Sequence, residues 1–195
     1  MGLAIDGQHN MRWDTLLSVD DYIGEIVRML EDAKEMENTY FLFTSDHGFQ
    51  LGQHRLPGDK RHLYEHDIRI PFVLRGPGVT ANHTVDSIVL SIDVAPTFTD
   101  IASGSVPDDM DGVSMLPLLG AKKAPDTWRT DFMVDYHGQG RQPCGLVQCP
   151  APPADNFHLI DGYNNTYTCV RTLHVDGKGV DSMYCEFVDV KSQAV

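Results

Sequence analysis

The sequence predicts an α/β fold in which a mostly parallel sheet is flanked by helices, followed by a smaller C-terminal region that contains β-strands. Two observations predict this fold. Segments with helical spacing of apolar residues alternate with short apolar runs that are rich in strand-forming residues. Near residues 120–126 the apolar periodicity gives way to Lys, Ala and Pro, so we assign residues 1–125 to one domain and residues 126–195 to a second.

The N-terminal part predicts one helix and two buried strands. Ser18 can cap a first helical turn, and apolar residues recur at helical spacing after it, which predicts a helix over 18–30 that packs on the sheet. Residues 6–12 read as a polar lead into this helix. The apolar runs 40–43 and 68–74 predict strands that are covered by helices.

The remaining elements are shorter. Residues 85–90 predict a strand or an extended edge, and residues 93–102 predict a short helix whose first turn tolerates Pro96. Residues 138–155 are rich in Gly, Pro and Gln and predict a loop. Further strands are predicted in the C-terminal region at 128–136, 163–172 and 183–188, the last two paired as a hairpin.

Composition describes an ordinary folded protein. The chain has 195 residues, of which 42% are hydrophobic and 22% charged, enough for one sizeable core. No apolar run approaches the roughly 18 residues of a membrane span, and residues 1–6 lack the basic and apolar regions of a signal peptide. With 15 basic and 28 acidic residues the net charge is −13, which disfavours nucleic acid and anionic membrane as partners.

Residues 40–78 contain the chemically informative side chains. Asp46 and His47 follow the run 40–43 directly, and ligands of α/β sheets gather at the carboxyl ends of strands. The pair can offer oxygen and nitrogen to a divalent cation, although an Asp-His turn with satisfied side chains is the alternative. Lys60 can reach the same pocket as a point charge for a sulfate or phosphate oxygen. The expected ligand is an anionic oxyester.

A basic loop surrounds Lys60. Arg55, Lys60 and Arg61 form a positive patch that can draw an anionic sugar towards an acidic protein. His54 and His62 add charge as the pH falls towards about 6.5, the usual imidazole pKa. His54 is predicted either to touch the substrate or to be a solvated loop residue.

The cysteines and two sequons indicate a secretory route. The cysteines are even in number and have no zinc-like spacing, which favours disulfides in a lysosomal or extracellular setting over unpaired cytosolic thiols. Their pairing stays open. Asn82 and Asn164 begin N-x-T tripeptides and are predicted glycosylation sites. All four cysteines lie in the last third of the chain: Cys144, Cys149, Cys169 and Cys185.

The chain resembles the sulfatase family. The resemblance rests on TSDHGFQLGQHRLPGDKRHLYEHDIRIPFVLRGPG at residues 44–78, and on RWDTLLSVDD, SIDVAPTFTDIA and MDGVSMLPLL around it. The blocks YNNTYTCVRT and YCEF favour the branch of N-acetylglucosamine-6-sulfatases. The resemblance implies an alkaline-phosphatase-like fold, here incomplete, and hydrolysis of sulfate esters. The implied substrate is the 6-sulfate of N-acetylglucosamine in glycosaminoglycans such as heparan or keratan sulfate.

The resemblance also implies residue roles. Asp46 and His47 become ligands of a Ca²⁺ ion, and Lys60 becomes the contact to a sulfate oxygen. Sulfatases attack with a formylglycine made from the cysteine of a C-x-P-S-R motif, and none of the four cysteines here begins one. We therefore interpret the chain as a C-terminal part of a sulfatase with half a metal site, and expect it to be inactive alone.

Two alternatives remain for the function. The first is a phosphoesterase or phosphomutase of the alkaline-phosphatase-like superfamily, whose members hold two transition metals with additional His and Asp ligands. The second is a module that binds sulfated glycans through residues 55–62 without catalysis. Metal preference and phosphate release distinguish the first alternative, and salt-sensitive glycan binding without turnover distinguishes the second.

Overall fold

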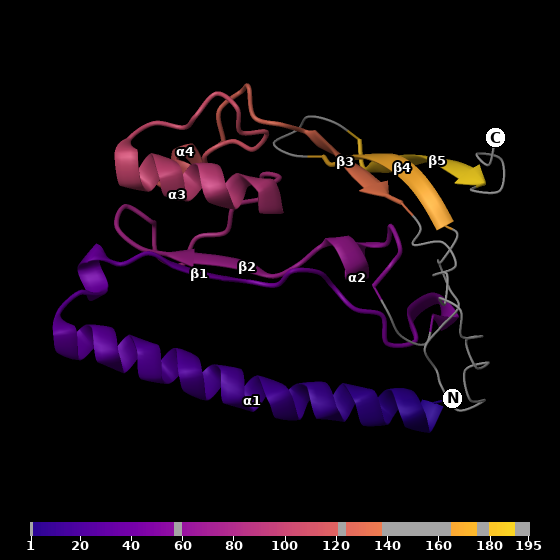
Figure 1. Ribbon diagram of the computed structural model, residues 1–195, viewed down its shortest axis with the longest axis horizontal. Helices are drawn as coiled ribbons and strands as arrows, with labels where there is room; N and C mark the ends of the chain where they lie inside the picture. Colours follow the sequence, from indigo (N-terminus) through magenta and orange to yellow (C-terminus); the bar gives the residue numbers. More distant parts are fainter. Residues whose placement is uncertain (1, 57–59, 121–123, 138–164, 175–179, 190–195) are drawn as a thin grey trace, which may run out of the picture. The chain divides into compact units, whose positions relative to one another are not determined.

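The computed structural model describes residues 2–56, 60–120, 124–137, 165–174 and 180–189 (Figure 1). The chain forms two compact units, each assembled from separated segments. The first unit comprises residues 1–73, 136–167 and 187–195, and the second comprises residues 74–135 and 168–186. The division of the sequence at residue 125 stays a prediction.

The first unit begins with α1 (Gly2–Ala33), a helix that is continuous in Figure 1. It ends where Lys34 adopts a left-handed backbone conformation with φ of 60°. The Lys34 N–H donates to the Glu31 carbonyl at 3.0 Å, and the Glu35 N–H donates to the Leu30 carbonyl at 2.9 Å. This pair of hydrogen bonds is the Schellman motif, which satisfies the last carbonyl groups of a helix.

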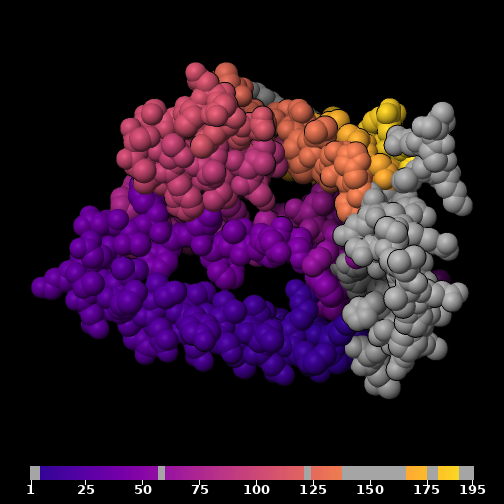
Figure 2. All heavy atoms as spheres, in the orientation of Figure 1, coloured from indigo at the N-terminus to yellow at the C-terminus, as the bar shows by residue number. Residues whose placement is uncertain are grey.

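The helix is longer than the predicted segment 18–30, and the expected polar lead at 6–12 is wrong. Residues 2–17 contain no proline and many good helix formers, so the helix extends through Ser18 instead of starting there. Most side chains of the face that was expected to pack on the sheet are exposed, for example Tyr22 at 66% and Ile26 at 43%, whereas Val27 and Leu30 are half-buried. The helix is the indigo segment in Figure 2. Among the described residues, no helix is both long and apolar enough to cross a membrane.

A two-stranded sheet follows, formed by β1 (Phe41–Thr44) and β2 (Phe72–Arg75). β1 is the strand predicted at 40–43. The strand predicted over 68–74 begins later, because α2 (Glu65–Ile68) occupies its first residue. The N–H groups of Asp67 and Ile68 both donate to the Tyr64 carbonyl, at 2.8 and 3.1 Å, and so close this helical turn.

The second unit contains α3 (Val94–Ser103), preceded by the 3-10 turn η3 (Ser91–Asp93), and the short α4 (Leu116–Leu119). The helix predicted over 93–102 is thus confirmed. Of the two alternatives predicted for residues 85–90, a strand or an extended edge, the strand is not formed. Its polar backbone groups bond elsewhere: the Ile88 carbonyl accepts from Trp128 Nε1 at 2.8 Å, and the Leu90 N–H donates to the Asp93 carboxylate at 2.8 Å.

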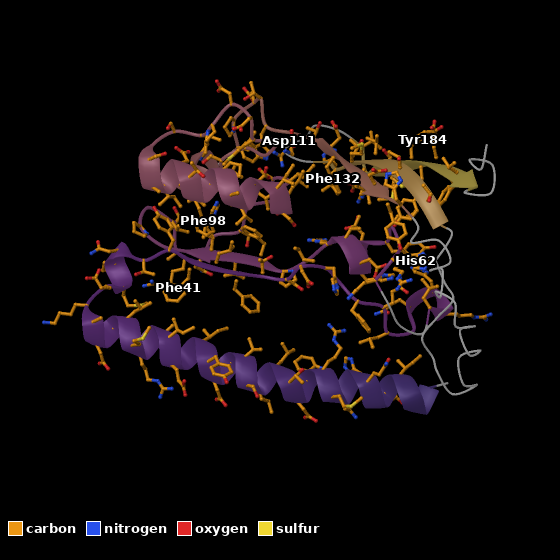
Figure 3. The ribbon with its side chains drawn as sticks, in the orientation of Figure 1. Phe41, His62, Phe98, Asp111, Phe132 and Tyr184 are labelled. Atoms are coloured by element: carbon orange, nitrogen blue, oxygen red, sulfur yellow. A yellow bond between two sulfur atoms is a disulfide. The ribbon has the colours of Figure 1, made fainter. Side chains whose placement is uncertain are left out.

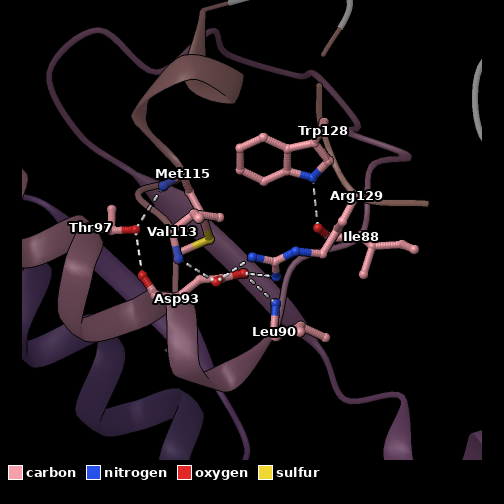
Figure 4. Close-up of polar contacts among 8 residues, drawn as sticks. All are labelled: Ile88, Leu90, Asp93, Thr97, Val113, Met115, Trp128 and Arg129. Atoms are coloured by element: carbon pink, nitrogen blue, oxygen red, sulfur yellow. Dashed lines mark hydrogen bonds and ion pairs between the residues drawn. The ribbon is translucent and has the colours of Figure 1, made fainter. Parts of the chain in front are cut away.

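Asp93 is the polar centre of this unit (Figure 4). Its side chain is completely buried and accepts four hydrogen bonds. Two come from the backbone N–H groups of Leu90 and Val113, at 2.8 and 2.9 Å, and two from Nη1 and Nη2 of Arg129, at 2.5 and 2.9 Å. Thr97 ties α3 to the same centre, because its hydroxyl donates to the Asp93 carbonyl at 2.6 Å. Asp93 therefore has a structural role.

A three-stranded sheet of β3 (Asp131–Tyr136), β4 (Asn165–Thr172) and β5 (Ser182–Asp189) has the order β3-β4-β5. All three strands predicted in the C-terminal region are present with shifted bounds. A disulfide joins Cys169 of β4 to Cys185 of β5, which confirms the prediction of disulfide bonding.

The two sequons differ in what the structure shows of them. Asn82 is exposed in a turn with φ of 52°, and its glycosylation stays a prediction. Asn164, Cys144 and Cys149 lie outside the described residues, as does the loop predicted over 138–155.

Candidate functional site

The turn after β1 brings the Asp46 carboxylate and the His47 imidazole together. Asp46 Oδ2 lies 3.3 Å from His47 Nε2, and Asp46 Oδ1 accepts the backbone N–H of His47 at 3.0 Å. The Ser45 hydroxyl closes the turn by donating to the His47 carbonyl at 2.8 Å. Because the Asp46 side chain is 83% exposed, its oxygens are accessible to a ligand.

The second ring nitrogen of His47 determines where the imidazole carries its proton. His47 Nδ1 lies 2.6 Å from the Gly48 carbonyl oxygen, which can only accept, so Nδ1 is the donor. A neutral ring then presents the lone pair of Nε2 to the Asp46 carboxylate. Two acceptor atoms this close repel each other unless a proton or a metal cation neutralises the contact. The pair is therefore suited to hold a positive charge.

A calcium ion fits this pair in part. Calcium–ligand distances of roughly 2.3–2.6 Å, taken at a right angle, put two donor atoms roughly 3.3–3.7 Å apart. Asp46 Oδ2 and His47 Nε2 lie 3.3 Å apart. Calcium takes roughly six to eight ligands, mostly oxygens, and this pair supplies only a few of them. In the described part of the chain, no group of three or more His, Cys, Asp or Glu side chains is arranged to hold a metal. The Asp46–His47 pair could therefore supply only some of the ligands that a calcium ion requires.

Gly48 joins the turn to the segment before β2. Its N–H donates to the Asp67 carbonyl at 2.8 Å, and the Phe49 N–H donates to the His66 carbonyl at 3.0 Å. A Cβ atom at position 48 would lie 1.8 Å from the His66 carbonyl oxygen, so only glycine permits this approach. The turn that holds Asp46 and His47 is therefore fixed to residues 66–67 through the main chain.

The predicted substrate-binding residues lie on the loop between these two segments. The 3-10 turn η2 (Gln53–Arg55) makes a sharp bend in which His54 and Arg55 have φ of 54° and 65°. Arg55 and Lys60 are exposed, whereas Arg61 is half-buried. The site roles of His54, Arg55, Lys60 and Arg61 stay predictions.

Asp67 holds this loop from its buried side, a role that the sequence analysis missed. Asp67 is only 5% exposed, and its Oδ2 accepts Gln50 Nε2 at 2.6 Å and the His62 backbone N–H at 2.9 Å. Its Oδ1 accepts no hydrogen bond from the described residues and lies 3.9 Å from His66 Nε2. The sequence carries no clear signal for this role, because Asp67 is flanked by the polar residues His66 and Arg69 and by Glu65.

Three imidazoles gather around the Tyr64 ring. The ring centroids of His54, His66 and His62 lie 4.6, 5.4 and 5.9 Å from that of Tyr64; Figure 3 labels His62. His54 is thus exposed on one side and packed on the other. The Tyr64 ring therefore packs against His54 and His66, which come from opposite ends of the loop.

Tyr167 of β4 contacts the same loop. Its hydroxyl donates to the Arg61 carbonyl at 3.2 Å, although the two residues are 106 positions apart in the sequence. The Tyr167 ring stacks on Tyr136 with centroids 5.4 Å apart and is only 2% exposed. Burial, with smaller contributions from the nearby Tyr136 and Asp67, raises the pKa of Tyr167 to about 12. The hydroxyl therefore keeps its proton and remains a donor near neutral pH.

Comparison with known proteins gives consistent similarities. A family model described as Sulfatase matches residues 5–105. The N-acetylglucosamine-6-sulfatase of Bos taurus is 44% identical over 196 residues, which cover 95% of this chain and 33% of the relative. A solved structure described as a complex with its substrate D-glucosamine-2-N,6-O-disulfate matches with a TM-score of 0.65 and 31% identity, over 91% of this chain and 33% of that chain.

A phosphonate monoester hydrolase from Silicibacter pomeroyi also matches, with a TM-score of 0.60 and 25% identity, over 90% of this chain and 33% of that chain. These structures confirm the predicted α/β fold of the alkaline-phosphatase-like type, in incomplete form. The chain spans about a third of the length of the proteins it matches.

Proposed function

The chain belongs to the sulfatase family, and we propose that it forms the part of a sulfuric ester hydrolase that holds a Ca²⁺ ion and the sulfate group of its substrate. The observation behind this proposal is the Asp46–His47 pair. Its carboxylate oxygen and imidazole lone pair converge at 3.3 Å and need a positive charge, and Asp46 is open to solvent.

In this proposal, different residues bind the calcium ion and the sulfated sugar. Asp46 and His47 would supply part of the calcium coordination, and the ion would neutralise negative charge on the sulfate oxygens. Lys60 would contact a sulfate oxygen as a second positive charge, and Arg55 and Arg61 would attract the anionic sugar. His54, packed against Tyr64, lies on the same loop.

The nucleophile would come from elsewhere. In these 195 residues no cysteine begins a C-x-P-S-R motif, so the formylglycine that the family uses is not encoded here. We therefore expect the chain by itself to bind a sulfated sugar without hydrolysing it.

The proposed substrate is the 6-sulfate of N-acetylglucosamine in a glycosaminoglycan. It is supported by the identity to an N-acetylglucosamine-6-sulfatase and by the likeness to a structure that holds a 6-O-sulfated glucosamine. The proposed location is the lysosome or the extracellular space. The Cys169–Cys185 disulfide supports it, because such bonds persist in oxidising compartments.

A second candidate is a phosphoesterase of the same superfamily, which the likeness to a phosphonate monoester hydrolase favours. Such an enzyme would prefer Zn²⁺ or Mn²⁺ to Ca²⁺ and would bind phosphate more tightly than sulfate. Titrating the chain with each metal, and then with N-acetylglucosamine 6-sulfate and its 6-phosphate analogue, separates the two candidates.

The proposed function is tested by calorimetric titration of the purified chain with Ca²⁺ and with N-acetylglucosamine 6-sulfate. Asp46→Ala should lower the calcium affinity about tenfold or more, because a charged ligand is lost. Lys60→Ala should weaken sugar binding at unchanged calcium affinity. Asp108→Ala, in an exposed acidic turn of the other unit, is the matched control. Wild-type calcium affinity in Asp46→Ala would remove the ligand assignment.

A further inference from the structure

The peptide group between Arg61 and His62 is held on both sides by buried side chains. Its carbonyl, which belongs to Arg61, accepts the Tyr167 hydroxyl at 3.2 Å. Its N–H, which belongs to His62, donates to Asp67 Oδ2 at 2.9 Å. Tyr167 is 2% exposed and Asp67 5% exposed, so both partners are shielded from water, which would otherwise compete for these hydrogen bonds.

Both partners are themselves fixed. The Tyr167 ring stacks on Tyr136 and lies 5.8 Å from the Phe187 ring, so β4 presents the hydroxyl from a packed position. On the other side, the Asp67 carboxylate also accepts Gln50 Nε2, and the Asp67 carbonyl accepts the Gly48 N–H. The peptide group is therefore tied to β4 on one side and to the metal-binding turn on the other.

We propose that Tyr167 is a positioning residue of the sulfate pocket. By holding the Arg61–His62 peptide group, it fixes the backbone that presents Lys60 and Arg61. This role in substrate binding rests on the proposed function, whereas the restraint on the peptide group does not. The pKa of about 12 means that the Tyr167 hydroxyl donates throughout the pH range in which a sulfatase is assayed.

Limited proteolysis with trypsin tests the restraint directly. Trypsin cleaves after Arg61, and the carbonyl that it must attack is the one that Tyr167 holds. Cleavage requires the loop to open locally, so its rate reports the population of the open form. Tyr167→Phe removes only the hydroxyl and keeps the stacked ring. It should speed cleavage at Arg61–His62 roughly fivefold, the effect of losing one ordinary hydrogen bond.

Two controls distinguish a local effect on the Arg61–His62 peptide group from a general loss of stability. Cleavage after Arg28 in α1, followed in the same digest by mass spectrometry, should keep its wild-type rate. Tyr184→Phe is the matched control, because Tyr184 projects from β5 (Figure 3), is 67% exposed and donates to Glu186 at 3.1 Å. This control should leave the Arg61–His62 rate unchanged. Asp67→Asn, which weakens the opposite side of the same peptide group, should accelerate the same cleavage as Tyr167→Phe does.

A binding measurement completes the test. Tyr167→Phe should weaken the affinity of the chain for N-acetylglucosamine 6-sulfate about threefold to tenfold while calcium affinity stays at its wild-type value. Unchanged cleavage after Arg61 in Tyr167→Phe would overturn the restraint, and unchanged sugar affinity would overturn the positioning role. If the wild-type chain does not bind the sugar, the proposed function and the role of Tyr167 in it fail together, while the cleavage rates still judge the restraint.

Discussion

Replacing Arg129 with alanine should destabilise the second unit strongly. The Asp93 carboxylate has no exposed surface and accepts hydrogen bonds from both Nη1 and Nη2 of Arg129, at 2.5 and 2.9 Å. After the substitution it would keep the backbone donors of Leu90 and Val113 but lose its counter-charge. A buried carboxylate without a compensating cation is costly, because the protein interior solvates charge poorly.

The magnitude follows from this geometry. Removing one partner of a buried ion pair costs about 3–5 kcal/mol. Two backbone donors remain for Asp93, so we expect the lower end, about 3 kcal/mol of unfolding free energy for Arg129→Ala. For a chain of this size each kcal/mol shifts the melting temperature by roughly 2–4 °C, which gives a decrease of about 6–12 °C.

The assay is urea and thermal unfolding followed by circular dichroism. Arg28→Ala is the control, because the exposed Arg28 donates through Nε only to the Gly24 carbonyl, at 3.1 Å. Its effect should stay within about 0.5 kcal/mol. Arg129→Lys keeps the charge but loses the two-pronged contact, so its stability should lie between wild type and Arg129→Ala. A loss below about 1 kcal/mol in Arg129→Ala would refute the reasoning.

Three further predictions concern other parts of the chain. Reducing the Cys169–Cys185 disulfide, which joins residues 16 positions apart, should lower the unfolding free energy by about 3 kcal/mol; equal urea midpoints with and without reductant would contradict this. Gly48→Ala should cost at least about 2 kcal/mol, because the new Cβ would meet the His66 carbonyl at 1.8 Å; a wild-type urea midpoint would count against it. Burial raises the pKa of Tyr167 to about 12. Between about pH 10 and pH 12 the unfolded chain loses a proton that the folded chain keeps, so stability should fall by up to about 2–3 kcal/mol as the pH rises. Tyr167→Phe should lack this part of the pH dependence in urea unfolding.

Local patterns predicted several elements of the fold. β1, α3 and the strands of the C-terminal sheet were predicted from short-range periodicity and turn residues, and the structure places elements there. Residues 85–90, predicted as a strand or an extended edge, form no strand, and the reason is non-local. The groups that bind their backbone are Asp93 and Trp128, and residues 85–90 alone do not show that these side chains will compete with strand pairing.

In the candidate site, too, contacts between sequence neighbours could be predicted and contacts between distant residues could not. Asp46 and His47 are adjacent in sequence, so their proximity could be predicted from a strand followed by a turn. Tyr167 contacts the basic loop across 106 positions, and neither periodicity nor spacing predicts such a contact. Asp67 stands among polar residues in the sequence, so its burial and its donors, Gln50 and the His62 backbone, are likewise evident only in the structure.

The main-chain hydrogen bonds from Gly48 and Phe49 to residues 66–67 hold the two ends of the intervening loop together. Residues 51–56 can then be exchanged while these hydrogen bonds continue to hold the Asp46–His47 turn. Under the proposed function, loops grafted at residues 51–56 would vary the segment beside Lys60 without replacing the proposed sulfate contact or the proposed calcium ligands. Affinity selection on a library of such grafts offers a practical route to new sulfoglycan binders.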